Sequence, residues 1–366
     1  MSAVVVFIIF AICLVIAIPI SISLGIVAVL PGAFDASFTA SAGYVIRSMV
    51  GGIDSFPLLA VPMFVLAGIL MAHGKISEKL FDVFVYFLGN KRAGIPCAVI
   101  ITCLFYGAIS GSAPATVAAV GSMTIPLLIE LGYEKDFSTA IVAVAGGLGV
   151  IIPPSIPFIM YAMATGESVS DLFLAGIVPG MMISALLIFY AYYYCRRHGE
   201  DREKIQAKMD QLKTKGFVNI LKESIWALLS PVIVLGCIYS GVASPTEAAV
   251  ISVFYSLFVS LFIYRSIKVK QIWGIMVEAM KTYAPILFIL ATSTAFSRVL
   301  TLMQVPQDVS AWIMTHFSNE IVLLIVINVV LLIVGMVMDT TPAILILSPI
   351  LLPIVEHVGM NPIHFG

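Results

Sequence analysis

Two serines and a glycine interrupt an apolar stretch at 107–121, which reads GAISGSAPATVAAVG. Ser110, Gly111 and Ser112 come just before Pro114. Glycine permits unusual backbone angles, and a proline near the start of a helix lacks an N–H group that would otherwise be unpaired. Hydroxyl and carbonyl oxygens are ligands for hard cations. These residues predict a sharp turn that binds a cation, although small residues also serve to pack membrane helices together.

A second stretch, AGGLGVIIPPSIPF at 145–158, cannot be one regular helix. Gly147 and Gly149 precede Pro153 and Pro154, and each internal proline removes a backbone hydrogen bond and clashes with the preceding turn. One interpretation is a kinked helix. We favour an unwound helix whose free carbonyls face the serine turn, so that the two segments together form an oxygen cage for sodium.

A third polar break, DTTPA at 339–343, lies inside the apolar run GMVMDTTPAILILSPILLPIVEHVG. A carboxylate at membrane depth is costly and is by default functional. Asp339, Thr340 and Thr341 therefore predict a second sodium site. The alternative is that Asp339 belongs to a surface loop.

The composition places these breaks in a membrane protein. Of the 366 residues, 61% are hydrophobic and 11% are charged, whereas soluble domains carry about 25% charged residues. The formal net charge of −1 provides no field that would attract nucleic acid. The five cysteines and five histidines show no spacing typical of a metal site or a nucleophilic enzyme, so we expect a protein that is not an enzyme and has no organic cofactor.

Apolar segments long enough to enter a membrane recur along the chain. They lie near 3–18, 19–32, 55–73, 94–131, 137–165, 171–195, 218–242, 245–264, 283–303 and 319–357. The fourth and the last are about twice as long as one span and have no charged loop at their middle. Non-helical backbone survives at membrane depth only inside protein or beside a cavity, so we predict two re-entrant helical hairpins with tips near Ser112 and Thr340.

Basic residues set the orientation. They are concentrated in RRHGEDREKIQAKMDQLKTKG at 196–216, which the positive-inside rule places in the cytoplasm.

The two long apolar runs also match each other. Gly107 corresponds to Gly335 and GSAPA to DTTPA, and an odd number of crossings separates the two units. This predicts an all-α inverted-repeat secondary transporter with discontinuous helices. Its parts are a first repeat at 1–195 (scaffold helices at about 1–90, a hairpin at 94–131, a broken helix at 137–165, a helix at 171–195), a cytoplasmic charged linker at 196–216, and a second repeat at 217–366 (scaffold helices at about 217–281, a helix at 283–303, a hairpin at 319–357).

Three stretches, ISGSAPATVAAVG, GGLGVIIPPSIPFIMYA and GVASPTEAAV, resemble the large membrane subunit of tripartite ATP-independent periplasmic (TRAP) transporters, which is called DctM-like or SiaM. The resemblance covers essentially the whole chain. It implies a sodium-driven, elevator-type importer of organic acids in the bacterial inner membrane, related to the ion-transporter superfamily. The implied partners are a small four-helix membrane subunit and a periplasmic substrate-binding protein.

One departure from the family pattern concerns the second repeat, which stops at NPIHFG before any counterpart of GGLGVIIPPSIP. We therefore expect the sequence to be truncated within the second cation site. A sodium and dicarboxylate symporter of the same type that needs no binding protein is the alternative function.

Arg298 is a cation within an apolar span, ILATSTAFSRVLTLM. Its side chain either extends to the membrane interface or anchors a substrate carboxylate, for which a guanidinium group offers two-point geometry. We predict the second role, with Ser112, Pro154 and Ser155 as further substrate contacts. The predicted substrate is a sialic acid, followed by a C4-dicarboxylate. Glu247, at the start of an apolar segment, is predicted to be structural.

Overall fold

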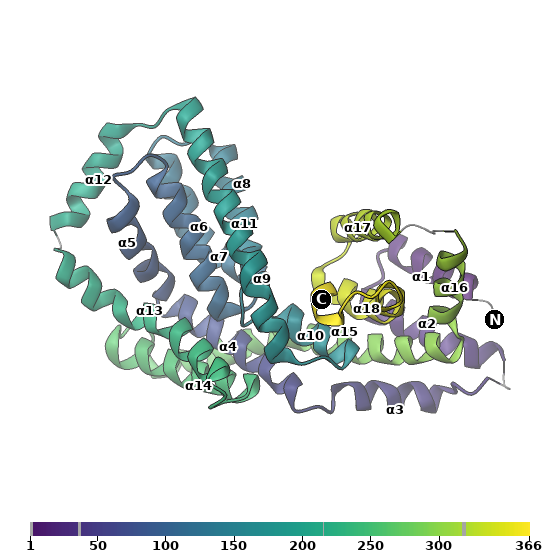
Figure 1. Ribbon diagram of the computed structural model, residues 1–366. Coiled ribbons are helices and arrows are strands. Elements are labelled where there is room, and N and C mark those ends of the chain that lie inside the picture. The colour runs from purple at the N-terminus through teal and green to yellow at the C-terminus, as the bar shows by residue number, and fades with distance from the viewer. Residues whose placement is uncertain (1–2, 36–37, 215, 317–319) are drawn as a thin grey trace. The chain divides into compact units, whose positions relative to one another are not determined.

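The computed structural model describes residues 3–35, 38–214, 216–316 and 320–366, and all regular structure in these ranges is helical (Figure 1). Six of the described helices are long and apolar enough to cross a membrane, or up to eight spans if each of two bent helix pairs counts as one. The chain is therefore an all-α, multi-pass membrane protein, as the sequence predicts.

The chain divides into two compact units that interleave along the sequence. The central unit contains residues 59–156 and 169–280, and the terminal unit contains 1–58, 157–168 and 281–366. Each unit therefore draws on both sequence halves, and the predicted halves 1–195 and 217–366 are not separate compact domains. The inverted repeat itself stays a prediction.

The central unit contains most of the long helices. In chain order they are α4 (Ala60–His73), α5 (Ile76–Leu88), α6 (Gly94–Ser110), α7 (Ala113–Glu130), α8 (Lys135–Gly146), α9 (Leu148–Ile151), α11 (Val169–His198), α12 (Arg202–Thr214), α13 (Phe217–Tyr239), α14 (Pro245–Phe258), a π-helical turn η2 (Val259–Ile263) and the first part of α15 (Val269–Leu302). Helices α6 and α7 form a hairpin that packs against α5, α8 and α11 (Figure 1). Its largest fully buried side chain is Tyr106.

The terminal unit contains α1 (Ala3–Val15), α2 (Ile20–Phe34), α3 (Ala42–Ile53), most of α10 (Ile156–Thr165), the second part of α15, α16 (Val305–His316), α17 (Glu320–Val337), α18 (Thr340–His357) and α19 (Pro362–Phe365). A short 3₁₀ turn, η1 (Pro57–Leu59), leads out of it. Its core joins α1, α2 and α15, where Phe296 stacks on Phe10 and contacts Phe7 edge-on. Helices α17 and α18 form a second hairpin.

Several predicted boundaries need correction. The helix predicted at 283–303 begins at Val269, and the linker predicted at 196–216 is itself largely helical, as α12. Helices α3 and α5 lie outside every apolar segment found in the sequence. Charged and small residues interrupt these helices. Helix α5 nevertheless buries apolar side chains such as Ile76, Leu80 and Phe81, whereas α3 buries Val45 together with two small residues. The structural role predicted for Glu247 is confirmed, because it forms a capping box with Ser244 at the start of α14.

Candidate functional site

The first hairpin reverses at a two-residue tip. Helix α6 ends at Ser110, Gly111 takes the left-handed φ of +61°, Ser112 is extended, and α7 begins at Ala113. A Cβ at position 111 would also lie 2.9 Å from the carbonyl oxygen of Pro154. Glycine at 111 is therefore required both by backbone conformation and by the close approach of another segment.

Buried hydroxyl groups surround the carbonyl of Ser112. The Thr116 hydroxyl donates to this carbonyl at 2.8 Å, and the Ser110 hydroxyl lies 3.0 Å from the Thr116 Oγ1 and 3.4 Å from the same carbonyl. The side chains of Ser110 and Thr116 are at most 1% exposed. Thr116 was not predicted as a site residue, yet it is the centre of this cluster.

The segment predicted to be unwound is broken in the structure. Helix α8 ends at Gly146, α9 is a single short turn, and residues 152–155 are not helical before α10 begins. Pro153 and Pro154 have no N–H to donate to the carbonyls of Gly149 and Val150, four residues earlier. The Val150 carbonyl instead accepts from the Ser155 hydroxyl at 2.5 Å.

The hairpin tip packs directly on this break. The Ile156 N–H donates to the Gly111 carbonyl at 3.2 Å. A Cβ on Gly107 would lie 2.4 Å from the Gly149 Cα, and a Cβ on Gly149 would lie 2.5 Å from the Thr116 Oγ1. The structure thus brings the predicted tip residues Ser110, Gly111 and Ser112 against the broken segment at Gly149 and Pro154. The predicted residues Gly147, Pro153 and Ser155 lie in the same broken segment of the central unit.

The chemistry of this cluster is that of neutral oxygen atoms. Its groups are serine and threonine hydroxyls and backbone carbonyls, and the described part of the chain contains no group of three or more histidine, cysteine, aspartate or glutamate side chains suited to a metal ion. A set of hydroxyls and carbonyls without a carboxylate suits a singly charged hard cation better than a transition metal.

The second hairpin tip is built differently. Helix α17 ends at Val337, and Asp339 is the N-cap of α18 but makes no capping hydrogen bond through its side chain. Asp339 and Thr340 are exposed and only Thr341 is buried. The Asp339 side chain is therefore exposed at the start of α18, and its predicted role as a sodium ligand stays a prediction.

A pocket of about 280 Å³ adjoins the second tip within the terminal unit. Thr340, Gly335 and Ser348 line it together with Tyr161, whose hydroxyl donates to the Pro362 carbonyl at 2.7 Å. Thr340 is the predicted site residue that reaches this pocket.

Arg298 lies on α15 in the terminal unit and is exposed. A Cβ added to Gly51 of α3 would lie 3.8 Å from the Arg298 Nη1, so the guanidinium group lies beside that glycine. Arg298 forms no ion pair with the residues that the structure describes. The other predicted substrate contacts, Ser112, Pro154 and Ser155, belong to the central unit.

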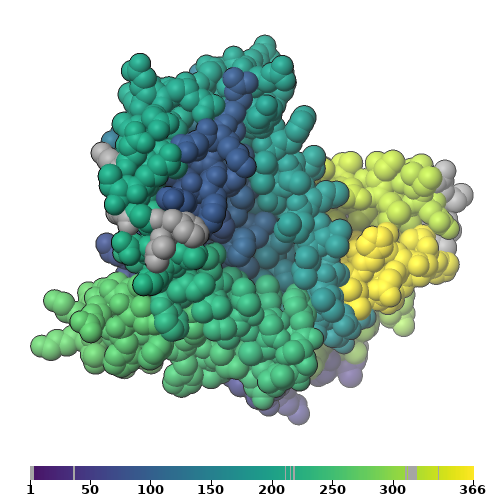
Figure 2. Space-filling view, turned by 60° about the vertical axis from the view of Figure 1, so that its left-hand side comes forward, coloured from purple at the N-terminus to yellow at the C-terminus, as the bar shows by residue number. Residues whose placement is uncertain are grey.

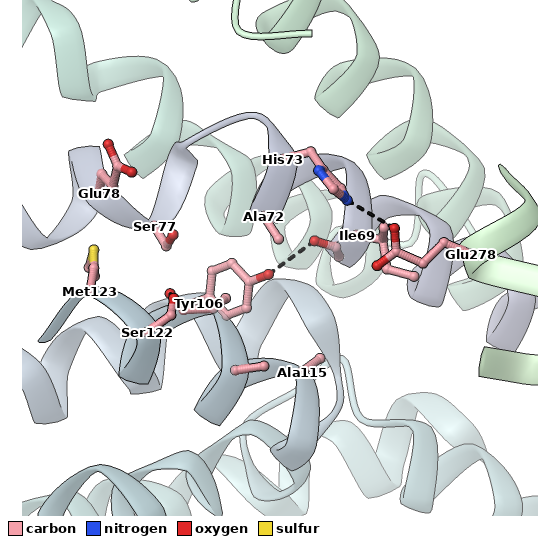
Figure 3. Close-up of a pocket in the computed structure, with 13 residues that line it drawn as sticks. Ile69, Ala72, His73, Ser77, Glu78, Tyr106, Ala115, Ser122, Met123 and Glu278 are labelled. Atoms are coloured by element: carbon pink, nitrogen blue, oxygen red, sulfur yellow. Dashed lines mark hydrogen bonds and ion pairs between the residues drawn. The ribbon is translucent and has the colours of Figure 1, made fainter. Parts of the chain in front are cut away.

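Another pocket, of about 340 Å³, lies beside the first hairpin and is lined by residues of α4, α5, α6, α7 and α15 (Figure 3). His73 and Glu278 pair at 2.9 Å in its lining, and the Tyr106 hydroxyl donates to the Gly68 carbonyl at 3.0 Å. A Cβ on Gly68 would lie 3.1 Å from the Ser110 Cα, so α4 also supports the hairpin tip. The predicted site residues lie outside this pocket's lining.

Residues 7–366 match the family described as "Tripartite ATP-independent periplasmic transporter, DctM component". The chain belongs to this DctM family. The sequence resemblance to a TRAP large membrane subunit is thereby confirmed.

Curated members of the DctM family are similar over most of this chain. The isethionate TRAP transporter permease DctMQ of Oleidesulfovibrio alaskensis is 42% identical over 98% of this chain and 55% of its own length. The C4-dicarboxylate large permease DctM of Pseudomonas aeruginosa is 39% identical over 86% of this chain and 72% of its own length. The 2,3-diketo-L-gulonate large permease YiaN of Escherichia coli is 38% identical over 87% of this chain and 74% of its own length. The chain thus spans only about half the length of the isethionate relative.

The fold is also found in a solved transporter structure. The YdaH transporter of Alcanivorax borkumensis, described as having an unusual topology, aligns with a TM-score of 0.59 over 94% of this chain and 82% of its own chain. At 14% sequence identity this likeness concerns the fold alone.

Proposed function

We propose that this chain is the large membrane subunit of a sodium-coupled TRAP importer of small organic anions in the bacterial inner membrane. The observation that carries the proposal is the first hairpin tip, where hydroxyls and carbonyls gather on a broken helix without a carboxylate among them. Sodium binds at Ser110, Gly111, Ser112, Gly147, Gly149 and Pro153. A second sodium ion binds at Asp339, Thr340 and Thr341.

The substrate class follows from the chemistry of the relatives' named substrates. Isethionate, C4-dicarboxylates and 2,3-diketo-L-gulonate are small oxygen-rich anions. We therefore widen the sequence-based expectation of a sialic acid to small carboxylates and sulfonates. In this proposal Ser112, Pro154 and Ser155 of the central unit contact the substrate, and Arg298 of the terminal unit is the anchor for an anionic group.

The proposed partners are a small four-helix membrane subunit and a periplasmic binding protein. Family membership supports them, because the DctM component is by its description one part of a tripartite periplasmic transporter. The charged segment 196–216 faces the cytoplasm in this orientation.

Uptake into proteoliposomes tests the proposal. The full transporter is reconstituted with its small subunit, the binding protein is added outside, and a panel of labelled sulfonates, C4-dicarboxylates and sugar acids, including a sialic acid, is supplied. We expect uptake of one class that requires an inward sodium gradient and no ATP. Equal uptake with potassium in place of sodium, or uptake that continues without the binding protein, would contradict the proposal.

A further inference from the structure

A single buried carboxylate joins the two ends of the first hairpin. Glu200 follows Gly199, where α11 has ended, and its side chain is only 2% exposed. One carboxylate oxygen accepts from the Ala93 N–H at 3.0 Å and from the Tyr133 hydroxyl at 2.7 Å, and the other pairs with Arg202 at 2.9 Å. Ala93 directly precedes α6, and Tyr133 lies three residues after the end of α7.

The neighbours of Glu200 in the sequence, Asp201 and Arg202, also contact the two ends of the first hairpin. The Arg202 guanidinium donates to the Asn90 carbonyl at 3.3 Å, on the entry side of the hairpin. On the exit side, a Cβ at Gly132 would lie 3.1 Å from the Asp201 Cβ. Asp201 also accepts from the Lys204 N–H at 3.2 Å, so it caps the start of α12.

Helix α12 continues this contact with an apolar face. Ile205, Met209 and Leu212 are buried in the same core as α5 and α6, and α12 packs along α5 (Figure 2). A Cβ at Gly89, in the turn between α5 and α6, would lie 2.3 Å from the Met209 Sδ. The charged linker is therefore anchored to the base of the hairpin.

Burial of a carboxylate is costly unless its hydrogen bonds are satisfied. Glu200 is satisfied by a backbone N–H, a phenol and a guanidinium group that come from three different segments. Burial and the hydrogen bond to Glu200 raise the pKa of Tyr133 above its usual range, so this phenol remains a neutral donor at physiological pH. Since Arg202 belongs to the same segment as Glu200, these bonds connect the start of α12 to the two ends of the hairpin at Ala93 and Tyr133.

We propose that Glu200 is a positioning residue of the transport cycle, which holds both ends of the first hairpin to α12 so that hairpin and linker move as one body. This inference rests on the proposed transport function. The 17 residues of α6, at about 1.5 Å each, place the tip about 25 Å from Ala93, so Glu200 acts on the movement of the hairpin rather than on ligands at its tip.

Four variants of the full transporter test this role. Glu200→Ala removes the carboxylate, and Glu200→Gln keeps an acceptor oxygen but loses the ion pair. Tyr133→Phe removes one hydrogen bond and retains the ring that packs near Phe137, so it is the variant least able to disturb folding. Glu203→Ala, at an exposed position of α12, is the control for loss of one negative charge from the linker.

Hydrogen exchange tests the contact independently of transport. We expect the amide of Ala93 to exchange at least about tenfold faster in Glu200→Ala, because a hydrogen bond to a charged group is lost and local opening becomes easier. Glu200→Gln should be intermediate and Glu203→Ala unchanged. Unchanged exchange at Ala93 in Glu200→Ala would overturn the proposal.

Transport kinetics separate a positioning role from a purely structural one. We expect the maximal uptake rate per folded transporter to fall several-fold in Glu200→Ala, and less in Tyr133→Phe, with the half-saturating sodium and substrate concentrations unchanged. A lower protein yield with a wild-type rate per transporter would overturn the proposal. If the wild-type transporter shows no sodium-driven uptake, the proposed function is wrong. If the wild-type transporter is active and Glu200→Ala transports at the same rate, only the proposed role of Glu200 is wrong.

Discussion

The two hairpin tips both reverse the direction of the chain, but they differ in how their polar groups are bonded and covered. At the first tip, Gly111 turns the chain and its carbonyl accepts from Ile156, so backbone of a broken helix covers the tip. At the second tip, Asp339 occupies the N-cap position of α18, makes no capping hydrogen bond through its side chain and is not covered by other parts of the chain. The first tip offers buried neutral oxygens held by hydrogen bonds, whereas the second offers an exposed carboxylate without a capping hydrogen bond.

This difference bears on how each tip would bind a cation. Fixed oxygens lose little conformational freedom when an ion binds, whereas an exposed carboxylate keeps strong hydration that must be given up. We therefore expect the first tip to bind sodium more tightly than the second tip does.

The largest expected effect comes from matched alanine substitutions at the paired glycines. Gly107→Ala would place a Cβ 2.4 Å from the Gly149 Cα, whereas Gly335→Ala meets nothing within 4 Å. Overpacking of this kind typically costs about 1–3 kcal/mol. We expect Gly107→Ala to abolish sodium-driven uptake and Gly335→Ala to retain it, measured per transporter after correction for abundance. Similar losses in both variants would remove the distinction between the tips.

Arg298→Lys is expected to have the next largest effect. This substitution tests whether a residue of the terminal unit binds the substrate. Lysine keeps the charge but loses the two-point geometry, and a hydrogen bond to a charged group is worth about 1.5–3 kcal/mol, which corresponds to a loss of about ten- to a hundredfold in substrate affinity. Arg47→Lys, at another exposed arginine of the same unit, is the control. Normal half-saturation by substrate in Arg298→Lys would exclude Arg298 as the anion anchor.

Thr116→Val and Thr340→Val make the same change at the two tips. Thr116 is buried and bonded to Ser110 and to the Ser112 carbonyl, whereas Thr340 is exposed. Thr116→Val removes one hydrogen bond of about 1 kcal/mol that helps to hold the Ser112 carbonyl in place, which predicts a rise of about five- to tenfold in the half-saturating sodium concentration. A larger shift in Thr340→Val than in Thr116→Val would reverse the assignment of the stronger site.

The smallest expected effect is that of Asp339→Asn. Because the carboxylate is exposed, its interaction with a cation is screened by water. We expect a two- to threefold change at most in half-saturation by sodium, as for other exposed charges of about 0.5 kcal/mol, and a less steep sodium dependence. An unchanged steepness in sodium titrations of uptake would argue against a second sodium ion at this tip.

The sequence predicted the parts of the first tip that depend on backbone conformation. Glycine at 111 permits the left-handed backbone conformation of the turn, and the prolines at 153 and 154 interrupt a helix whatever surrounds them. The turn and the break could therefore be predicted from the positions of these residues in the sequence. Thr116 was missed because its hydroxyl bonds to the carbonyl four residues earlier, which is what a threonine in an apolar helix commonly does whether or not it lies at a site. Its position four residues after Ser112, on the same helix face, is the signal that could have identified it.

Other features could not be predicted because they depend on tertiary contact. Glu200 stands in a segment rich in charges, and nothing in the sequence distinguishes it from exposed Glu203. Its burial arises only when α12 folds back on the base of the hairpin. The exposure of Asp339 likewise depends on tertiary contact, because a hydropathy pattern gives the depth of a residue along a span but not which groups cover it.

Hydrogen exchange of the full transporter, in sodium and in potassium at equal ionic strength, tests the central claim that the first tip binds sodium. The Ile156 amide, which donates to the Gly111 carbonyl, and the amides of 108–116 report on the tip and the break together. We predict that sodium, and not potassium, slows exchange at both segments, and more strongly than at 336–343 in the second hairpin. Equal exchange in the two salts at 108–116 and at Ile156 would contradict a sodium site at the first tip.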